Sequence, residues 1–128
     1  MATVVLDTFA KRRALAVAEV NLSDIRDNIT DYLANDGANL TSDDYTDLRY
    51  AAHNAQDKVD AAFLALANAN RYAATAWQNA QPGDIITTYN GECGTLKARG
   101  TIAGWMTVPG KDREVRVELA YVESIARD

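Results

Sequence analysis

The side chains best suited to bind a ligand lie in the last third of the chain. Guanidinium groups form paired hydrogen bonds with phosphate oxygens, and an aromatic face can stack against a nucleobase. Residues 84–122 supply both kinds of group, together with one amide, and the candidates are Tyr89, Asn90, Arg99, Trp105, Arg113 and Arg116. This set predicts a binding site for a small anionic ligand. The alternative is that Trp105 belongs to the core and that the arginines are solvated partners of Glu114 and Glu118.

No set of residues in the sequence has the spacing of a catalytic or metal site. His53 and Cys93 are the single histidine and cysteine, and we interpret them as an exposed helix residue and a passive loop thiol. Asp43, Asp44 and Asp47 lack the series of oxygen ligands, closed by a glutamate, that an EF-hand requires. Phosphate-loop, dinucleotide-binding and nucleophile-elbow motifs are also missing. We therefore predict no catalytic residue, no metal and no cofactor, and we do not expect an enzyme.

A long helix rich in alanine is predicted from residue 41 to residue 80. Apolar residues recur along it at alternating steps of three and four, which is typical of a helix that packs along another helix. The seam comprises Tyr45, Leu48, Ala52, Ala55, Val59, Ala62, Leu66, Ala69, Ala73 and Ala76. Thr41 and Ser42 are favourable N-cap residues, and Pro82 with Gly83 marks the end.

A second helix is predicted from residue 9 to residue 35, on the N-terminal side of the long one. Its seam consists of Leu15, Ala18, Leu22, Ile25, Ile29 and Tyr32. Asn35, Asp36 and Gly37 form a helix stop in which the glycine can adopt a left-handed conformation. Because the connection is short, the two helices are expected to form an antiparallel hairpin.

Apolar residues outside the two seams predict that the hairpin associates with another copy. Phe63, Leu64, Ala67 and Tyr72 form a second stripe on the long helix, which one partner helix cannot cover. We therefore expect a homo-oligomer, either a dimer or an assembly built from dimers. The alternative is that the C-terminal part of the same chain covers this stripe.

The N-terminus and the C-terminal third of the chain have the pattern of β-strands. Runs rich in β-branched residues predict strands at residues 2–6, 84–90, 95–99, 101–108 and 113–122. GECG, from residue 91, and PGKD, from residue 109, are expected to be turns. The two turns are expected to lie near each other. The predicted fold class is α+β, with a short N-terminal strand, a long antiparallel helical hairpin and a small C-terminal antiparallel sheet. We expect a single domain over residues 1–128, with residues 1–80 forming the strand and hairpin and residues 81–128 the small β part.

Composition excludes several classes of partner. The formal net charge is −5, whereas proteins that bind DNA or RNA generally rely on a cationic surface, so neither is expected as a partner. No uninterrupted apolar run is long enough for a membrane helix, and the N-terminus lacks the pattern of a secretory signal. A single cysteine suits a reducing cytoplasm.

In layout, the chain resembles the first type of phage Thoeris anti-defence proteins. The resemblance rests on the N-terminal strand leading into VLDTFAKRRALAVAEVNLSDIRDNI, the hairpin to LTSDDYTDLRYAAHNAQDKVDAAFLAL, and the small β part that begins with PGD. It implies a non-enzymatic sponge, made by a phage in the cytoplasm of an infected bacterium, which captures the cyclised ADP-ribose signal of bacterial TIR immunity. Some members also bind cyclic oligonucleotides, and the family assembles as dimers or dimer-based oligomers.

The expected function is therefore capture of a small anionic cyclic nucleotide without degradation. The site residues named above follow from their own chemistry and not from the family. The alternative is a phage structural or adaptor protein that assembles through its hairpin. An enzyme would need a cluster of titratable groups that the sequence does not contain.

Overall fold

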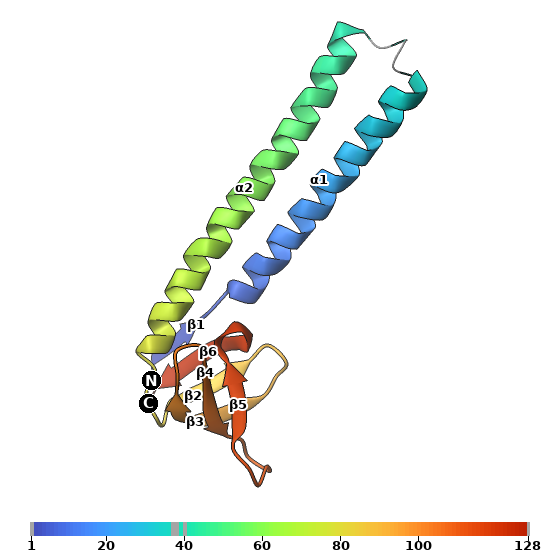
Figure 1. Cartoon of the computed structure of the whole chain (residues 1–128). Coiled ribbons are helices and arrows are strands. Elements are labelled where there is room, and N and C mark those ends of the chain that lie inside the picture. The colour runs from blue at the N-terminus through green and yellow to red at the C-terminus, as the bar shows by residue number, and fades with distance from the viewer. Residues whose placement is uncertain (1, 37–38, 40, 128) are drawn as a thin grey trace. The chain divides into compact units, whose positions relative to one another are not determined.

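The computed structural model describes residues 2–36, 39 and 41–127 (Figure 1). Gly37, the predicted left-handed glycine, lies outside the described residues. The chain divides into two compact units, residues 12–66 and residues 1–11 together with 67–128. Their boundary crosses both helices, whereas the sequence suggested a division near residue 80. The difference arises because the last turns of the long helix pack against the sheet.

Residues 12–66 form a hairpin of two helices. Helix α1 spans Thr8–Asp36 and helix α2 spans Ser42–Gln78, close to the predicted bounds. Thr41 caps α2 as expected: its Oγ1 accepts a hydrogen bond from the Asp44 backbone N–H at 3.2 Å, while its own N–H donates to Asp44 Oδ2 at 2.9 Å. The two helices are also joined by a hydrogen bond of 3.1 Å from Arg26 Nη2 to Gln56 Oε1.

The two predicted seams are half-buried rather than fully buried. Most seam residues of both helices are partly covered, although Tyr32 and Tyr45 remain 45% exposed. Among the described residues from 12 to 66, only Leu22 and Ala55 are buried. Alanine side chains let helices approach closely but bury little apolar area, so a two-helix hairpin of this composition has a thin core. Neither helix, over the described residues, has the length and apolar character needed to cross a membrane.

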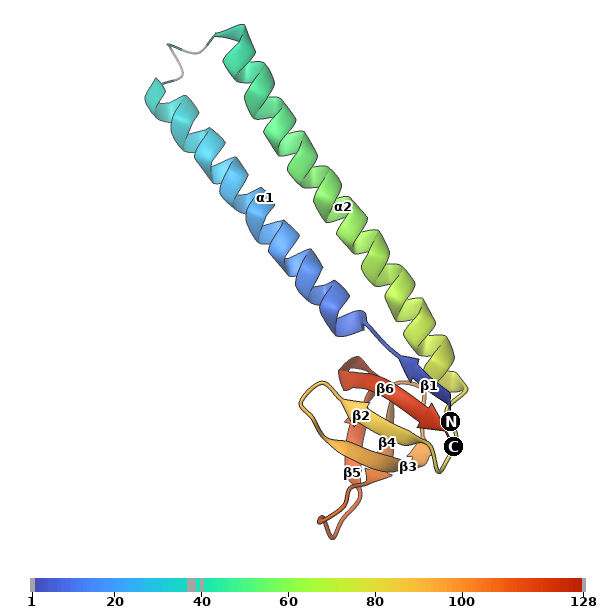
Figure 2. The ribbon, with the colours of Figure 1, turned by 180° about the vertical axis from the view of Figure 1, so that it is seen from behind.

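The second unit contains an antiparallel sheet. Its strands are β1 (Ala2–Val5), β2 (Ile85–Thr88), β3 (Cys93–Arg99), β4 (Ala103–Thr107), β5 (Val115–Glu118) and β6 (Val122–Arg127). The described strands form one sheet in the order β1-β6-β2-β3-β4-β5. Four consecutive strands thus follow one another as a meander, and β6 returns to lie between β1 and β2, as Figure 2 shows.

The predicted strand at residues 113–122 is wrong in one respect. A short 3-10 helix, Leu119–Tyr121, interrupts it, and the chain continues as β6, a separate strand that was not predicted. The turn is held by contacts that are distant in sequence: the Leu119 N–H donates to the Ile102 carbonyl at 2.9 Å, and the Tyr89 N–H donates to the Tyr121 carbonyl at 2.9 Å. The alternation of apolar residues gave no sign of this break.

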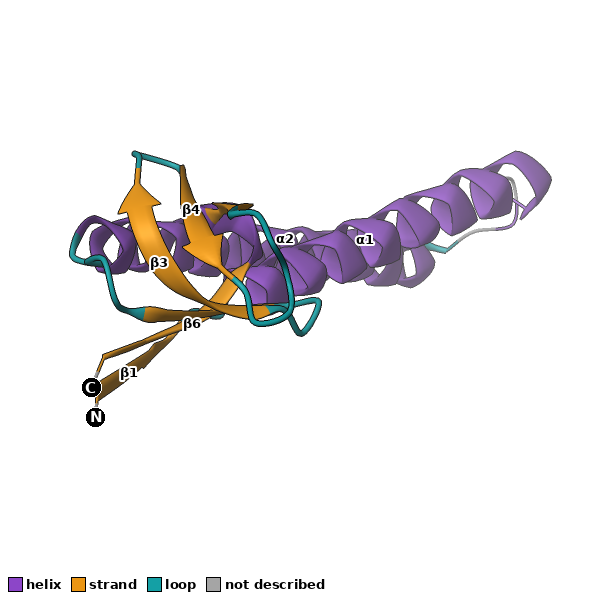
Figure 3. Cartoon of the chain, turned by 90° about the horizontal axis from the view of Figure 1, so that it is seen from below, coloured by secondary structure: helices purple, strands orange, loops and turns teal. Residues whose placement is uncertain are grey.

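One core lies between the curled sheet and the last turns of α2. Figure 3 shows the helices and strands of the chain from below. The largest fully buried side chains are Leu6, Trp77, Ile86, Leu96, Met106 and Val122. Trp77 is completely buried, and its indole N–H donates to the Gly100 carbonyl at 3.0 Å. A Cβ at Gly104 would lie 3.2 Å from the Trp77 ring and 2.6 Å from the Ala98 carbonyl oxygen, so only glycine fits there.

A buried carboxylate ties the start of β2 to the end of β6. Asp84 is 3% exposed, and its two oxygens accept hydrogen bonds of 2.9 Å from Arg127 Nε and Nη2. Its Oδ2 also accepts the Gln81 backbone N–H at 2.9 Å. The hydrogen bond from Arg127, opposed by burial and aided by the Gln81 N–H, lowers the pKa of Asp84 below its ordinary value of 3.8.

We expect Asp84→Asn to lower the free energy of unfolding at neutral pH by about 1–3 kcal/mol, because a charged hydrogen-bond network is lost. The folded pKa of Asp84 lies below the unfolded one, so this contribution is complete above about pH 4 and disappears as the pH falls through the lowered pKa. Urea unfolding of both proteins at pH 7 and at pH 3 measures it. A difference between them that stays the same at both pH values would contradict the assignment.

Candidate functional site

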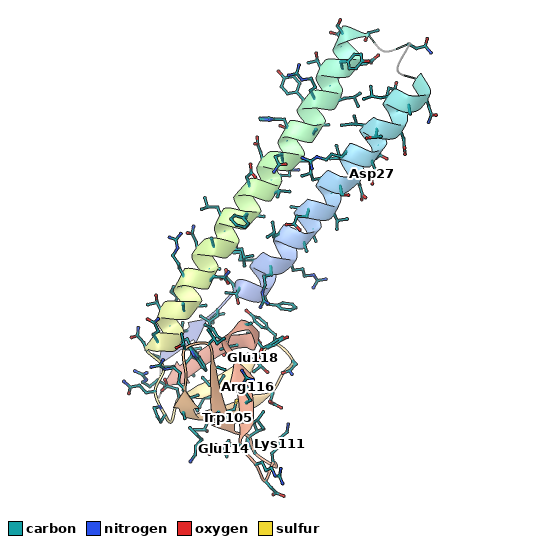
Figure 4. The ribbon with its side chains drawn as sticks, in the orientation of Figure 1. Asp27, Trp105, Lys111, Glu114, Arg116 and Glu118 are labelled. Atoms are coloured by element: carbon teal, nitrogen blue, oxygen red, sulfur yellow. The ribbon has the colours of Figure 1, made fainter. Side chains whose placement is uncertain are left out.

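An open depression on the sheet brings together three of the six predicted site residues. Trp105 on β4 lies directly opposite Arg116 on β5, and Arg99 stands at the end of β3. Figure 4 shows Trp105 and Arg116 on these neighbouring strands. The three residues line a hollow of about 540 Å³, together with Ala98, Gly100, Ala103 and Gly104. Trp105 is 47% exposed, so the alternative that it belongs to the core is wrong.

Arg116 has an acidic neighbour on its own strand. Its Nη2 lies 3.7 Å from Glu118 Oε1, and both side chains are about half exposed. An exposed ion pair of this length contributes little to stability. Arg116 can therefore turn towards an anionic ligand, although Glu118 will compete for its charge.

Arg99 is partly engaged in the fold. Its Nε donates to the Ala80 carbonyl at 3.1 Å, and its Nη1 donates to the Gly100 carbonyl at 3.5 Å. A guanidinium carries five N–H donors, so three remain for a ligand. The contact with Ala80 also fixes the direction of the side chain, which reduces the entropy lost when a ligand binds.

Tyr89 and Asn90 have structural roles in the turn between β2 and β3. The Tyr89 hydroxyl donates to the Leu6 carbonyl and accepts the Phe9 backbone N–H at 3.3 Å, while its ring lies 4.8 Å from the Phe9 ring. Asn90 Oδ1 accepts hydrogen bonds from Thr88 Oγ1 and from the Glu92 N–H. Neither residue lines the depression that Trp105 occupies.

A second hollow, of about 340 Å³, lies on the other side of Arg116. It is lined by Thr88, Asn90, Glu92, Arg116, Val117, Glu118 and Tyr121. Asn90 and Arg116 therefore share this hollow, while Trp105 and Arg99 do not reach it. The sequence did not indicate that Tyr121 would line a hollow. Tyr121 belongs to the 3-10 turn, its side chain is 57% exposed, and the sequence carries no signal for that turn.

Arg113 is exposed in the turn before β5 and lines neither hollow. Within the described part of the chain it makes no hydrogen bond or ion pair. The expected proximity of the GECG and PGKD turns is confirmed by an ion pair between them, in which Lys111 Nζ lies 2.9 Å from Glu92 Oε2.

The remaining reactive groups form no cluster. His53 lies 3.4 Å from Asp57 on the exposed side of α2, and Cys93 Sγ lies 3.7 Å from Thr87 Oγ1 at the start of β3. Across residues 2–36, 39 and 41–127, no three histidine, cysteine or acidic side chains are placed to hold a metal.

Gly94 and Gly104 lie where β3 and β4 pack too closely for a side chain. A Cβ at Gly94 would lie 2.7 Å from the Thr107 carbonyl oxygen and 3.0 Å from Met106 Sδ. Both glycines are buried and serve the packing of β3 and β4 against the core.

No family model, curated protein or solved structure matches the chain.

We expect Tyr89→Phe to lower the free energy of unfolding by about 1–2 kcal/mol, because the Leu6 carbonyl and the Phe9 N–H lose their shared partner. Tyr121→Phe is the matched control, since its ring is exposed and its loss should change stability by less than about 0.5 kcal/mol. Chemical denaturation followed by circular dichroism measures both. Equal stability of the two variants would show that Tyr89 is free for a ligand instead.

Proposed function

We propose that the protein captures a small anionic cyclic nucleotide and holds it intact, as a phage anti-defence sponge in the cytoplasm of an infected bacterium. The ligand class is a cyclic ADP-ribose isomer, with glycocyclic ADP-ribose as the first candidate and cyclic oligonucleotides as a further class. One observation supports this most: the exposed Trp105 lies opposite Arg116 in a hollow that Arg99 also lines. Adenine would stack on the indole, and the two guanidinium groups would bind the pyrophosphate.

The magnitudes indicate that one chain alone would bind weakly. Stacking on an aromatic ring contributes about 1–3 kcal/mol, and each charge-assisted hydrogen bond about 1.5–3 kcal/mol. Association and side-chain ordering offset much of that sum. The hollow is open to solvent, so tight capture requires further contacts. We propose that a neighbouring subunit supplies them by closing over the ligand in a homo-oligomer.

A second candidate function is a phage structural or adaptor protein, and the hairpin favours it. Between residues 12 and 66, the described part of the chain buries only Leu22 and Ala55, whereas Val17, Phe63 and Leu64 are 64%, 64% and 59% exposed. Long helices with this much exposed apolar surface are typical of segments that are covered by a partner. In this case the hairpin would exist for assembly, and the depression would be incidental.

One experiment separates the two functions. The purified protein is incubated with cyclic ADP-ribose isomers or with cyclic dinucleotides, freed of unbound ligand by gel filtration and denatured by heat. A sponge releases the intact nucleotide, which mass spectrometry identifies. An enzyme would release a converted product. If neither ligand class is retained, the sponge function is rejected and the structural function takes its place.

We expect Arg116→Ala to weaken nucleotide binding by roughly ten- to a hundredfold, because one charge-assisted contact is lost. Arg116→Lys keeps the charge without the planar fork and should fall between the wild type and the alanine variant. Trp105→Ala should weaken binding of adenine-containing ligands by a similar factor. Isothermal titration calorimetry measures all three.

Arg113→Ala is the matched control for these variants. Arg113 is an exposed arginine of the same unit that lines neither hollow, so its removal should change the affinity much less. If Arg113→Ala loses as much affinity as Arg116→Ala, the ligand lies on the turn before β5 and not against Trp105.

We expect Leu64→Asp to shift the protein towards a smaller assembly, because a carboxylate on the exposed apolar stripe cannot be buried against a second copy without a large desolvation penalty. Asn54→Asp adds the same charge at an exposed polar position of α2 and should leave the oligomer intact. Light scattering at micromolar concentration gives the mass of each. A wild type that is already monomeric there would rule out self-association.

A further inference from the structure

Two strands of the described sheet have an outer edge that no described strand covers: β1 and β5. They differ in how well they are protected. Strand β5 (Val115–Glu118) carries Arg116 and Glu118, and charges on an edge strand discourage pairing with another chain. Strand β1 reads ATVV and contains no charge and no proline, and its pairing with β6 has no bulge. Such an edge is a ready template for a further strand.

The hydrogen bonds of β1 show which backbone groups face outwards. The Leu6 N–H donates to the Glu123 carbonyl at 2.7 Å, which continues the register in which Val4 lies opposite Ile125. In an antiparallel ladder, residues bond to the neighbouring strand in alternation. Leu6 and Val4 therefore bond towards β6, and the backbone N–H and C=O groups of Thr3 and Val5 point to the open edge.

An apolar groove lies along the same strand. It has a volume of about 300 Å³ and is lined by Ala2 and Val4 of β1, Ile125 of β6, and Tyr72 and Ala76 of α2. Its polar end holds the Asp84–Arg127 pair. Tyr72 is 55% exposed and Val5, on the opposite face of β1, is 64% exposed. Figure 2 shows β1 beside β6, with the end of α2 above them.

We propose that β1 pairs antiparallel with β1 of a second copy, about a two-fold axis that places Val4 opposite the partner's Val4. Thr3 then lies opposite the partner's Val5, so that their outward-facing backbone groups form the hydrogen-bonded pairs of the new ladder. A two-fold axis perpendicular to the sheet keeps both grooves on the same face. On this face, four β-branched side chains would form one row across the strands. The row runs from Ile125 and Val4 to the partner's Val4 and the partner's Ile125.

The chemistry of the edge favours a second copy over an unrelated strand. The pairing is self-complementary, as a two-fold interface requires, because the same short segment supplies both sides. Strand β1 carries no charge, so no like charges face each other across the axis. The two grooves would join on one face of the paired strands. The exposed ring of Tyr72 and that of the partner's Tyr72 lie on this face, and the second copy would cover the apolar surface of the groove.

This interface is separate from the proposed function. It does not involve the hollow around Trp105, and of the stripe that contains Leu64 it uses only Tyr72. If the protein binds no nucleotide, the proposed β1 interface is unaffected. If the β1 strands do not pair, the proposed nucleotide site is unaffected.

Cysteine cross-linking tests the proposal and its register together. In a Cys93→Ser background, Val4→Cys would place two thiols across a pair that is not hydrogen-bonded, with Cα atoms about 4.5 Å apart, which is within the range of a disulfide. Ala2→Cys is the matched control, because the two substituted positions would be about 13 Å apart along the strands. Under mild oxidation we expect Val4→Cys to form the cross-linked dimer at least roughly tenfold faster than Ala2→Cys, as seen on non-reducing gels.

A second variant guards against a folding defect at Val4. Val5→Lys puts a charge on the exposed face of the same edge, and, added to Val4→Cys, it should slow cross-linking severalfold while circular dichroism stays unchanged. Thr101→Lys, in an exposed loop, should not slow it. The proposal is overturned if Val4→Cys cross-links no faster than Ala2→Cys, or if Val5→Lys leaves the rate unchanged.

Discussion

The burial of Trp77 is the interaction on which the sheet-containing unit depends. Its ring is completely covered, and its N–H reaches the Gly100 carbonyl at the end of β3. This contact fixes the last turns of α2 over the β3–β4 connection, where Gly104 has no room for a side chain. Because side chains alternate along a strand, the inward positions of Gly104 and Met106 force Trp105 outwards. The exposed indole of the candidate site is therefore a consequence of how the core is packed.

The two units reach their stability by different means. The sheet and the end of α2 share a contiguous core of large side chains, which includes Leu6, Ile86 and Val122. The hairpin of residues 12–66 relies on helical propensity, a capped start and a seam of small side chains, and its described residues bury only two positions. Alanine contributes little transfer free energy, so the core of the hairpin is thin. The same composition leaves large apolar side chains such as Phe63 and Leu64 exposed on α2.

The candidate site shows how much of its chemistry the fold already uses. Arg99 anchors the end of β3 to Ala80, so its guanidinium group is oriented before any ligand arrives, whereas Arg116 has only a weak, exposed ion pair with Glu118. Preorganised donors lose less entropy on binding, but their present partners must be displaced or shared. The depression thus combines one oriented cation, one cation with a weak partner and one exposed indole.

The sequence by itself determined what depends on local periodicity. The spacing of Leu22 and Ala55 within their seams, the Thr41 cap and the β-branched run at residues 2–5 each act over a few residues, and the helical hairpin and the strands follow from them. Only the tertiary structure decided the 3-10 turn at Leu119–Tyr121, the central place of β6 and the structural roles of Tyr89 and Asn90. The turn and β6 are held by hydrogen bonds between residues far apart in the chain. Because an alternating pattern reads the same on either side of such a turn, periodicity could not reveal where the strand would break.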